Sequence, residues 1–266
     1  MSSESHYDCQ PAAEQPFGCV ELWAGNERAH RHVDLPGLEG DLIALPSGGT
    51  QGGDLYALFS CGASRSARIV LADCVGHGFT ASGVAMHIHQ ILHKFRDVRD
   101  TAGLLAALND EFTLMGQSPG APLRLITVVT ATFDRDTGEF NYAYAAHPRM
   151  LLWRARERRW SPLGEGLEGL PMGFIAGEQY NQQSVRLEPH DMVLAVSDAV
   201  IEVESPAGKQ LTAEGFFHLA GKTLERMPHP PSLHDFCEAL LEEVRRFRGA
   251  QELKDDLTLL VLRRAV

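Results

Sequence analysis

The fold of this chain is constrained most by apolar runs that end or begin at an aspartate. The runs 69–72 and 193–196 lead to Asp73 and Asp198, and a third run closely follows Asp255. Apolar runs of this length, bounded by glycines and polar residues, predict buried strands. Each of these carboxylates is therefore expected at the end of a strand, where a site can be assembled at the edge of a sheet.

Glycines accompany the carboxylates. The segment Gly52-Gly53-Asp54 precedes one apolar run, and Gly76 and Gly78 follow Asp73. Glycine has no Cβ, so backbone and ligand can approach each other closely. Hard divalent cations choose oxygen ligands, often one or two carboxylates with several waters. Acidic clusters that are far apart in sequence thus predict a cation and phosphate site that folding brings together.

The order of the expected elements favours an α+β fold. Helical spacing of apolar residues predicts helices at 79–95, 101–116, 213–223 and 232–247. One or two strands are expected within 19–45, and further strands at 55–59, 67–72, 125–133, 140–144, 150–154, 192–196 and from 257 onward. Strands and helices come in runs instead of alternating, which favours antiparallel layers over βαβ units.

Length and charge limit the remaining choices. The 266 residues are expected to form a flexible tail at 1–17 and one domain at 18–266. The formal net charge of -11 argues against a nucleic-acid partner or an anionic membrane surface. Neither a membrane-spanning run nor a signal pattern is present, so a cytoplasmic location is expected. The five cysteines include no CxxC pair, which favours free thiols.

Six short motifs, in the same order, resemble those of the PPM-type metal-dependent protein serine/threonine phosphatases, in the bacterial SpoIIE-like branch of sporulation and stress response. The motifs are GGDLY at 52–56, DCVGHG at 73–78, AHP at 146–148, GLPMG at 169–173, SDAV at 197–200 and DDLTLL at 255–260. The resemblance implies two antiparallel β-sheets sandwiched between α-helices, with two Mn²⁺ or Mg²⁺ ions at one end.

The resemblance also implies the ligands of these ions. Asp73 would bridge the two ions, and the backbone carbonyl of Cys74 would bind one of them. Asp198 and Asp255 would hold the other ion, and Asp54 would bind directly or through water.

Two points of the motifs stay open. Asp256 is an alternative to Asp255 as the ligand, with the other residue orienting water or the surrounding groups. Ala199 stands where the family has glycine, and Cys74-Val75 stands where it has Val-Ser. These departures leave every carboxylate in place but put the rate and the metal affinity in question.

The implied reaction is hydrolysis of phosphoserine or phosphothreonine on a partner protein by a water that two metal ions activate. The expected partner is a STAS-domain anti-sigma factor antagonist. Regulation would come from another protein or from a homodimer. A non-catalytic regulatory module that binds a kinase or antagonist is the alternative, and hydrolysis of a small phosphorylated metabolite is a third hypothesis.

The histidines and the arginine cluster have simpler interpretations than the aspartates. His77 and His147 could position phosphate, but loop packing is the favoured role for both. His89 and His93 have helical i, i+4 spacing without an accompanying HExxH glutamate, which favours an exposed helix surface. The arginine cluster at 154–159 is expected on a solvated hairpin.

Overall fold

The computed structural model describes residues 20–47, 49–60, 65–74, 79–96, 98, 100–116 and 125–266. The tail predicted at 1–17 lies outside the described residues, and so does the segment 75–78 with His77. Among the described helices, none combines the length and the apolar character that crossing a bilayer requires. The bounds of the domain and the cytoplasmic location stay predictions.

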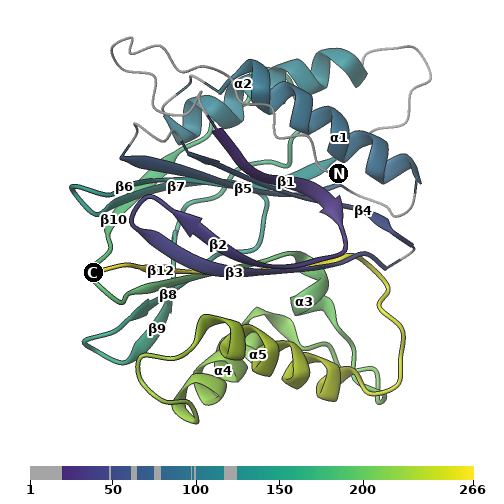
Figure 1. Ribbon diagram of the computed structural model, residues 1–266. Coiled ribbons are helices and arrows are strands. Elements are labelled where there is room, and N and C mark those ends of the chain that lie inside the picture. Colours follow the sequence, from purple (N-terminus) through teal and green to yellow (C-terminus); the bar gives the residue numbers. More distant parts are fainter. Residues whose placement is uncertain are drawn as a thin grey trace, which may run out of the picture.

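The described strands form two six-stranded sheets whose paired neighbours are all antiparallel (Figure 1). The first sheet contains, in order, β1 (Val20–Glu27), β4 (Gln51–Ser60), β5 (Ser66–Cys74), β6 (Ile126–Asp134), β7 (Glu139–Ala145) and β10 (Gln182–Arg186). The second contains, in order, β2 (Ala29–Leu35), β3 (Leu38–Leu45), β12 (Leu257–Arg264), β11 (Met192–Val196), β8 (Leu151–Arg154) and β9 (Arg159–Pro162).

Helices cover the outer face of each sheet. The first sheet packs against α1 (Phe79–Lys94) and α2 (Thr101–Gly116). The second packs against α3 (Asp198–Glu202), α4 (Thr212–Glu225) and α5 (Leu233–Arg248). Figure 1 shows the two sheets stacked face to face between these helical layers. This arrangement confirms the predicted α+β fold of two antiparallel sheets between helices.

Alternation along the strands explains why several strands are apolar at every position. In β12, Leu260 and Leu262 belong to the layer between the sheets, whereas Leu259 and Val261 belong to the layer under α4 and α5. Successive strand side chains point to opposite faces. Because both faces of each sheet are covered, both sets of side chains are buried. The run at 69–72 of β5 is divided between two layers in the same way.

Some elements differ from the sequence expectations. Residues 20–45 form three strands instead of one or two, and β9, β10 and α3 were not predicted. The edge strand β10 has the sequence QQSVR and is mostly exposed, so it lacks the apolar alternation that marks a strand. The helix α3 has five residues, which is too short for a helical period to show. The hairpin predicted around the arginine cluster is formed by β8 and β9.

Candidate metal centre

Strand ends from both sheets supply the acidic residues of the candidate site. In the first sheet, β4 and β5 pair through Leu55 and Ala72, so Asp54 and Asp73 follow one step further at the same end of the pair. In the second sheet, α3 begins at Asp198 directly after β11, and Asp255 lies just before β12. The sequence thus places two carboxylates on each sheet, and the stacking of the sheets decides whether they meet.

The electrostatics of Asp73 show that they do meet. Burial and, to a smaller extent, the negative charges of Asp54, Asp198 and Asp255 together raise the pKa of Asp73 to about 10. A side-chain hydrogen bond with Asp198 acts in the same direction. Asp73 and Asp198 are therefore in direct contact although 125 positions separate them. Carboxylates this close disfavour one another's ionised form, and a divalent cation would reverse that effect.

Asp54 is held between the two sheets. Its Oδ2 atom accepts a hydrogen bond of 2.7 Å from the hydroxyl of Thr258 in β12. Its Oδ1 atom is buried and has no hydrogen-bond partner among the described residues. Burial raises the pKa of Asp54 well above its usual range, although hydrogen bonds from Thr258 and Ser197 oppose that shift. A buried carboxylate oxygen without a donor fits a metal ligand.

Asp256 has a different set of partners. It is buried, and its carboxylate accepts hydrogen bonds from the backbone N–H groups of Ser47, at 2.6 Å, and Gly53. A Cβ at Gly52 would overlap this carboxylate. The close approach explains why the segment before Asp54 needs a glycine. Both oxygens of Asp256 are engaged with the backbone, which favours Asp255 as the residue that faces a cation.

Asp255 lies beside a cavity of about 220 Å³ that Ala199 and Glu202 also line. Asp255 is half-buried, and its Oδ1 atom accepts a hydrogen bond of 2.9 Å from the backbone N–H of Asp256. Ala199 lies in the helical backbone of α3 and is buried in the apolar layer under the helices. The methyl group at this position is therefore accommodated by the fold.

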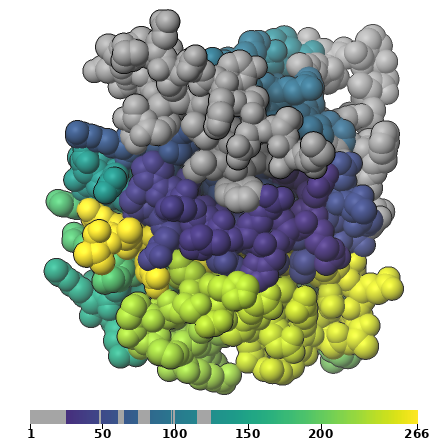
Figure 2. All heavy atoms as spheres, in the orientation of Figure 1, coloured from purple at the N-terminus to yellow at the C-terminus, as the bar shows by residue number. Residues whose placement is uncertain are grey.

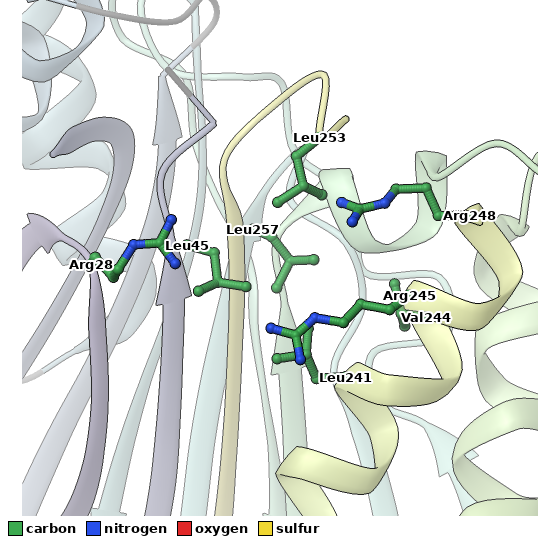
Figure 3. A pocket seen from close by; sticks show the side chains of 8 residues that line it. All are labelled: Arg28, Leu45, Leu241, Val244, Arg245, Arg248, Leu253 and Leu257. Atoms are coloured by element: carbon green, nitrogen blue, oxygen red, sulfur yellow. The ribbon is translucent and has the colours of Figure 1, made fainter. Parts of the chain in front are cut away.

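An apolar pocket continues from this cavity along α5 (Figure 3). Its volume is about 200 Å³, and it shares Arg248 and Leu253 with the first cavity. Leucines form much of its floor, and Figure 3 shows Arg28, Arg245 and Arg248 around it. The pocket along α5 thus combines apolar contact area with three arginines, whereas the cavity at Asp255 is lined by more acidic than basic side chains.

Cys74 and His147 are also near the acidic residues. The Cys74 side chain is buried in the layer beneath α1 and α2, which fits the predicted thiol without a disulfide. The ligand role of its backbone carbonyl stays a prediction. Burial lowers the pKa of His147 to about 4, and the opposing charge is that of Asp198. His147 is therefore a neutral imidazole close to Asp198, and its Nε2 atom has no partner in the described part of the chain.

The structure also adds residues that sequence reasoning missed. Ser197 and Thr258 lie within the SDAV and DDLTLL motifs, and both hydroxyls act on Asp54. Ser197 further accepts a hydrogen bond of 2.9 Å from the backbone N–H of Thr258. Their positions beside aspartates in two motifs were a usable signal, but their role depends on how the sheets stack.

Two other groups of candidate residues lie outside the acidic cluster. His89 and His93 lie on α1 with ring centroids 4.8 Å apart, and His93 is exposed, as predicted for a helix surface. Arg154 in the arginine cluster makes an ion pair of 2.7 Å with the buried Asp191. The groups that raise the pKa of Asp73 are Asp54, Asp198 and Asp255. Neither the two histidines nor the Arg154–Asp191 ion pair belongs to this set.

Comparison with known proteins agrees with this geometry. A family model described as stage II sporulation protein E (SpoIIE) matches residues 63–265. The phosphoserine phosphatase RsbU of Bacillus subtilis (strain 168) is 26% identical over 276 residues, which cover 100% of this chain and 76% of that protein.

Solved structures share the fold. The RsbU and RsbW domains of Rv1364c from Mycobacterium tuberculosis match with a TM-score of 0.71 and 26% identity, over 90% of this chain and 63% of that chain. This chain therefore spans less than two thirds of that protein. The SiaA-PP2C domain of Pseudomonas aeruginosa matches in fold with a TM-score of 0.68 and 19% identity, over 84% of this chain and 85% of that one.

The family model covers well over half of the length of this chain. The chain therefore belongs to the stage II sporulation protein E family and is a protein serine/threonine phosphatase of the PPM type.

Proposed function

We propose that this phosphatase removes phosphate from serine or threonine of a partner protein, using two Mn²⁺ or Mg²⁺ ions. The proposed ligands are Asp54, Asp73, Asp198, Asp255 and the backbone carbonyl of Cys74. The observation that carries the proposal is the contact between Asp73 and Asp198, with Asp54 and Asp255 close enough to raise the pKa of Asp73. Phosphatases of the PPM type are metal-dependent, and this cluster supplies oxygen ligands for hard cations.

The chain's own residues prepare the site for phosphate ester hydrolysis. Bound divalent ions supply a water acidified to a near-neutral pKa and positive charge for the phosphoryl oxygens. The hydroxyl of Thr258 holds Oδ2 of Asp54 by a hydrogen bond. This bond fixes the orientation of the carboxylate and leaves Oδ1 for a cation. Asp256 fixes the backbone on both sides of Gly52 and thereby the position of β4. The neutral His147 adds no positive charge that would compete with a cation.

For the substrate we propose a phosphorylated STAS-domain protein. Support comes from the curated relative RsbU, which is named a phosphoserine phosphatase. Further support comes from the arginine-edged pocket that continues from the cavity at Asp255 (Figure 3). A protein surface with apolar and acidic side chains would match this pocket, and Arg pairs well with phosphate and carboxylate groups. Control by a second protein or by homodimerisation belongs to the same proposal.

Hydrolysis of p-nitrophenyl phosphate by the full chain tests the activity and its metal dependence. We expect turnover with Mn²⁺, loss of turnover with EDTA, and a decrease of at least about 100-fold in Asp73→Asn. Asp34→Asn, an exposed aspartate on β2, is the matched control and should retain activity.

A phosphorylated STAS-domain protein, compared with a free phosphoserine peptide, then tests the substrate. Faster release of phosphate from the folded protein would support recognition of a protein surface. A wild-type chain that binds the phosphorylated protein without releasing phosphate would instead favour the non-catalytic regulatory module.

A further inference from the structure

A buried carboxylate interrupts an apolar face of the second sheet. Asp41 lies in β3 and is 2% exposed. Ile43, two positions along the same face, belongs to the apolar layer beneath α4 and α5. A buried charge is costly unless it is paired or binds a metal ion. The groups around Asp41 therefore need a specific explanation.

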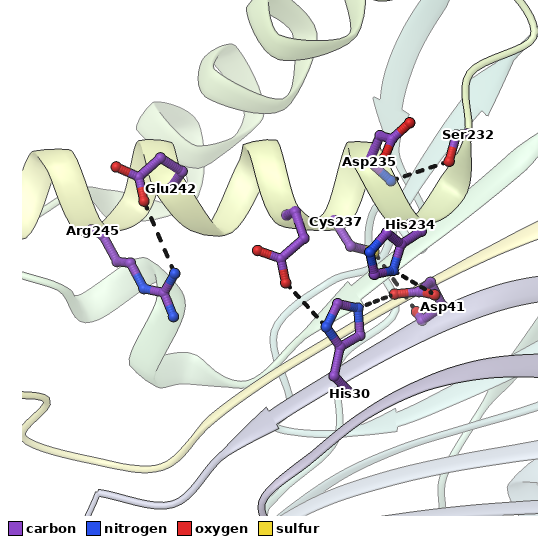
Figure 4. A network of polar contacts seen from close by, with 9 residues as sticks. His30, Asp41, Ser232, His234, Asp235, Cys237, Glu242 and Arg245 are labelled. Carbon is purple, nitrogen blue, oxygen red and sulfur yellow. Dashed lines mark hydrogen bonds and ion pairs between the residues drawn. The ribbon is translucent and has the colours of Figure 1, made fainter.

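Two histidines from different elements face this carboxylate (Figure 4). His30 in β2 places its Nε2 atom 2.7 Å from Oδ1 of Asp41, and His234 in the first turn of α5 places its Nδ1 atom 3.7 Å from Oδ2. The two imidazole rings are stacked, with centroids 4.5 Å apart and planes inclined by 15°. One donor atom from each of the three residues lies within 4.8 Å of the other two.

We propose that His30, Asp41 and His234 form a Zn²⁺ site, with solvent as the fourth ligand. Two imidazole nitrogens and one carboxylate oxygen are a donor set that zinc accepts. Zinc bonds of about 2.0–2.2 Å at tetrahedral angles place donor atoms about 3.4 Å apart. The separations from Asp41 are 2.7 Å from His30 to Oδ1 and 3.7 Å from His234 to Oδ2, and one donor atom of each residue lies within 4.8 Å of the others, so small side-chain movements would bring them to that spacing. Because the two stacked ring planes are almost parallel, His234 must rotate about its side-chain bonds for both rings to bind one ion, and its 60% exposure leaves room for that rotation.

Glu238 completes the surroundings of the site. Its Oε1 atom lies 3.0 Å from Nδ1 of His30, on the ring nitrogen that does not face Asp41. Histidines that bind metal usually donate their other N–H to such a carboxylate, which fixes the tautomer and the ring orientation. Glu238 therefore acts as a positioning residue, and His30 presents Nε2 to the ion.

An ion can reach the site from solvent. The side chains of His30 and His234 are 31% and 60% exposed, whereas Asp41 lies at the bottom. Figure 2 shows β2 and β3 (purple) next to the C-terminal helices (yellow-green) on this face of the molecule. A bound ion would join the β2–β3 hairpin to α5.

The site is separate from the phosphatase centre. Asp41 pairs with Val261 in β12, four positions beyond Leu257. At about 3.3 Å per residue, this is about 13 Å along the strand from the end where Asp255 lies. Zinc at His30 is therefore a property of the chain that does not depend on catalysis.

Zinc titration of the metal-stripped full chain tests the proposal, with saturating Mg²⁺ present to fill hard-ion sites. Calorimetry should show one more Zn²⁺ bound per chain in the wild type than in His30→Gln or His234→Gln. Glu238→Gln should retain the ion with affinity lowered about 10–100-fold. Co²⁺ in place of Zn²⁺ should give a visible spectrum of nitrogen and oxygen ligands that both histidine variants lose.

The matched control is His218→Gln on α4. His218 is exposed, and its Nε2 atom lies 3.9 Å from Glu214, so it has a similar imidazole–carboxylate pair but no third donor nearby in the described part of the chain. This variant should bind zinc as the wild type does. His234 is largely exposed, so its variant should fold, which circular dichroism and the Tm in EDTA would verify. Equal zinc stoichiometry in the wild type and in His234→Gln would overturn the proposal and leave a hydrogen bond between His30 and Asp41.

Discussion

Buried aspartates have three kinds of partner in this chain: backbone N–H groups, an arginine, or other carboxylates. Asp256 engages both carboxylate oxygens with backbone N–H groups, and Asp191 pairs with Arg154. Asp54 and Asp73 instead lie beside other carboxylates, which raise their pKa values further above those that burial alone would give. The first two residues stabilise the fold as they stand, whereas the second two are suited to a cation.

The raised pKa of Asp73 predicts a pH-dependent stability of the metal-free protein. The folded state keeps the proton of Asp73 up to about pH 10, whereas the unfolded chain releases it near pH 4. This stabilising contribution is fully present below about pH 4 and is lost as the pH rises toward 10. Asp73→Asn should therefore gain stability relative to the wild type as the pH rises, by at most about 1.4 kcal/mol per pH unit.

Urea unfolding in EDTA at pH 6 and pH 8 measures this difference. The wild type should lose more stability between the two pH values than Asp73→Asn does. Asp34→Asn should follow the wild type because Asp34 is exposed. A difference between Asp73→Asn and the wild type that stays constant with pH would contradict the assignment.

Two glycines predict opposite outcomes for the same substitution. Gly52→Ala forces the Asp256 carboxylate away from the Ser47 and Gly53 N–H groups, which should cost about 1–3 kcal/mol of unfolding free energy and reduce activity. Gly83→Ala, on the exposed side of α1, should gain about 0.5–1 kcal/mol, because among the described residues no atom outside the helix backbone and the adjoining residues lies within 4 Å of the new Cβ. Chemical denaturation of both variants checks the signs.

At the scale of elements, the site depends on the contact between β4 and β12. These strands belong to different sheets, and the hydrogen bond from Thr258 to Asp54 joins them directly. The loop before β12 adds the bonds of Asp256 to Ser47 and Gly53. The active end of the molecule is thus fixed by polar contacts between layers whose interior is otherwise apolar.

Replacing the threonine hydroxyl tests this connection. Thr258→Val leaves Asp54 Oδ2 without its donor and should cost about 1–3 kcal/mol in stability, with weaker Mn²⁺ binding. Thr130→Val in β6 is the matched control, because the Thr130 hydroxyl is buried and has no partner among the described residues. This control should be neutral or stabilising. Equal losses in both variants, measured by thermal unfolding, would show that the hydroxyl of Thr258 has no special role.

On the scale of the whole molecule, the acidic site exists only when both sheets are stacked. Asp54 and Asp73 come from the first sheet, and Asp198 and Asp255 come from the ends of strands in the second. An unfolded chain does not hold these residues together, so cations that bind the folded state stabilise it by mass action.

Mn²⁺ should therefore raise the Tm of the full chain, and EDTA should lower it. At a free concentration about 100 times the Kd, the expected gain is about 2.7 kcal/mol for each site. Differential scanning calorimetry at pH 8 measures the rise in Tm. The bound cations there offset the mutual repulsion of the carboxylates. Asp73→Asn should show little of the shift, and a wild-type Tm that is insensitive to Mn²⁺ would contradict the proposed metal centre.

Much of the fold follows from local pattern. The run at 125–133 predicts β6 within one residue, and Ser232 was recognisable as the cap of α5, where its hydroxyl accepts from the backbone N–H of Asp235. The order of elements predicted the antiparallel layers. The short polar strand β10 could not be predicted, because pairing with β7 and not its own periodicity makes it a strand.

The sequence by itself determined which residue types lie at the strand ends, and the six motifs determined the family. Only the tertiary structure decided that Asp256 binds backbone whereas Asp255 borders the cavity, that Thr258 holds Asp54, and that two histidines meet Asp41. The physical reason is that strand periodicity and helical spacing act over a few residues. Contacts between positions 200 apart depend instead on strand register and on the stacking of two separate sheets.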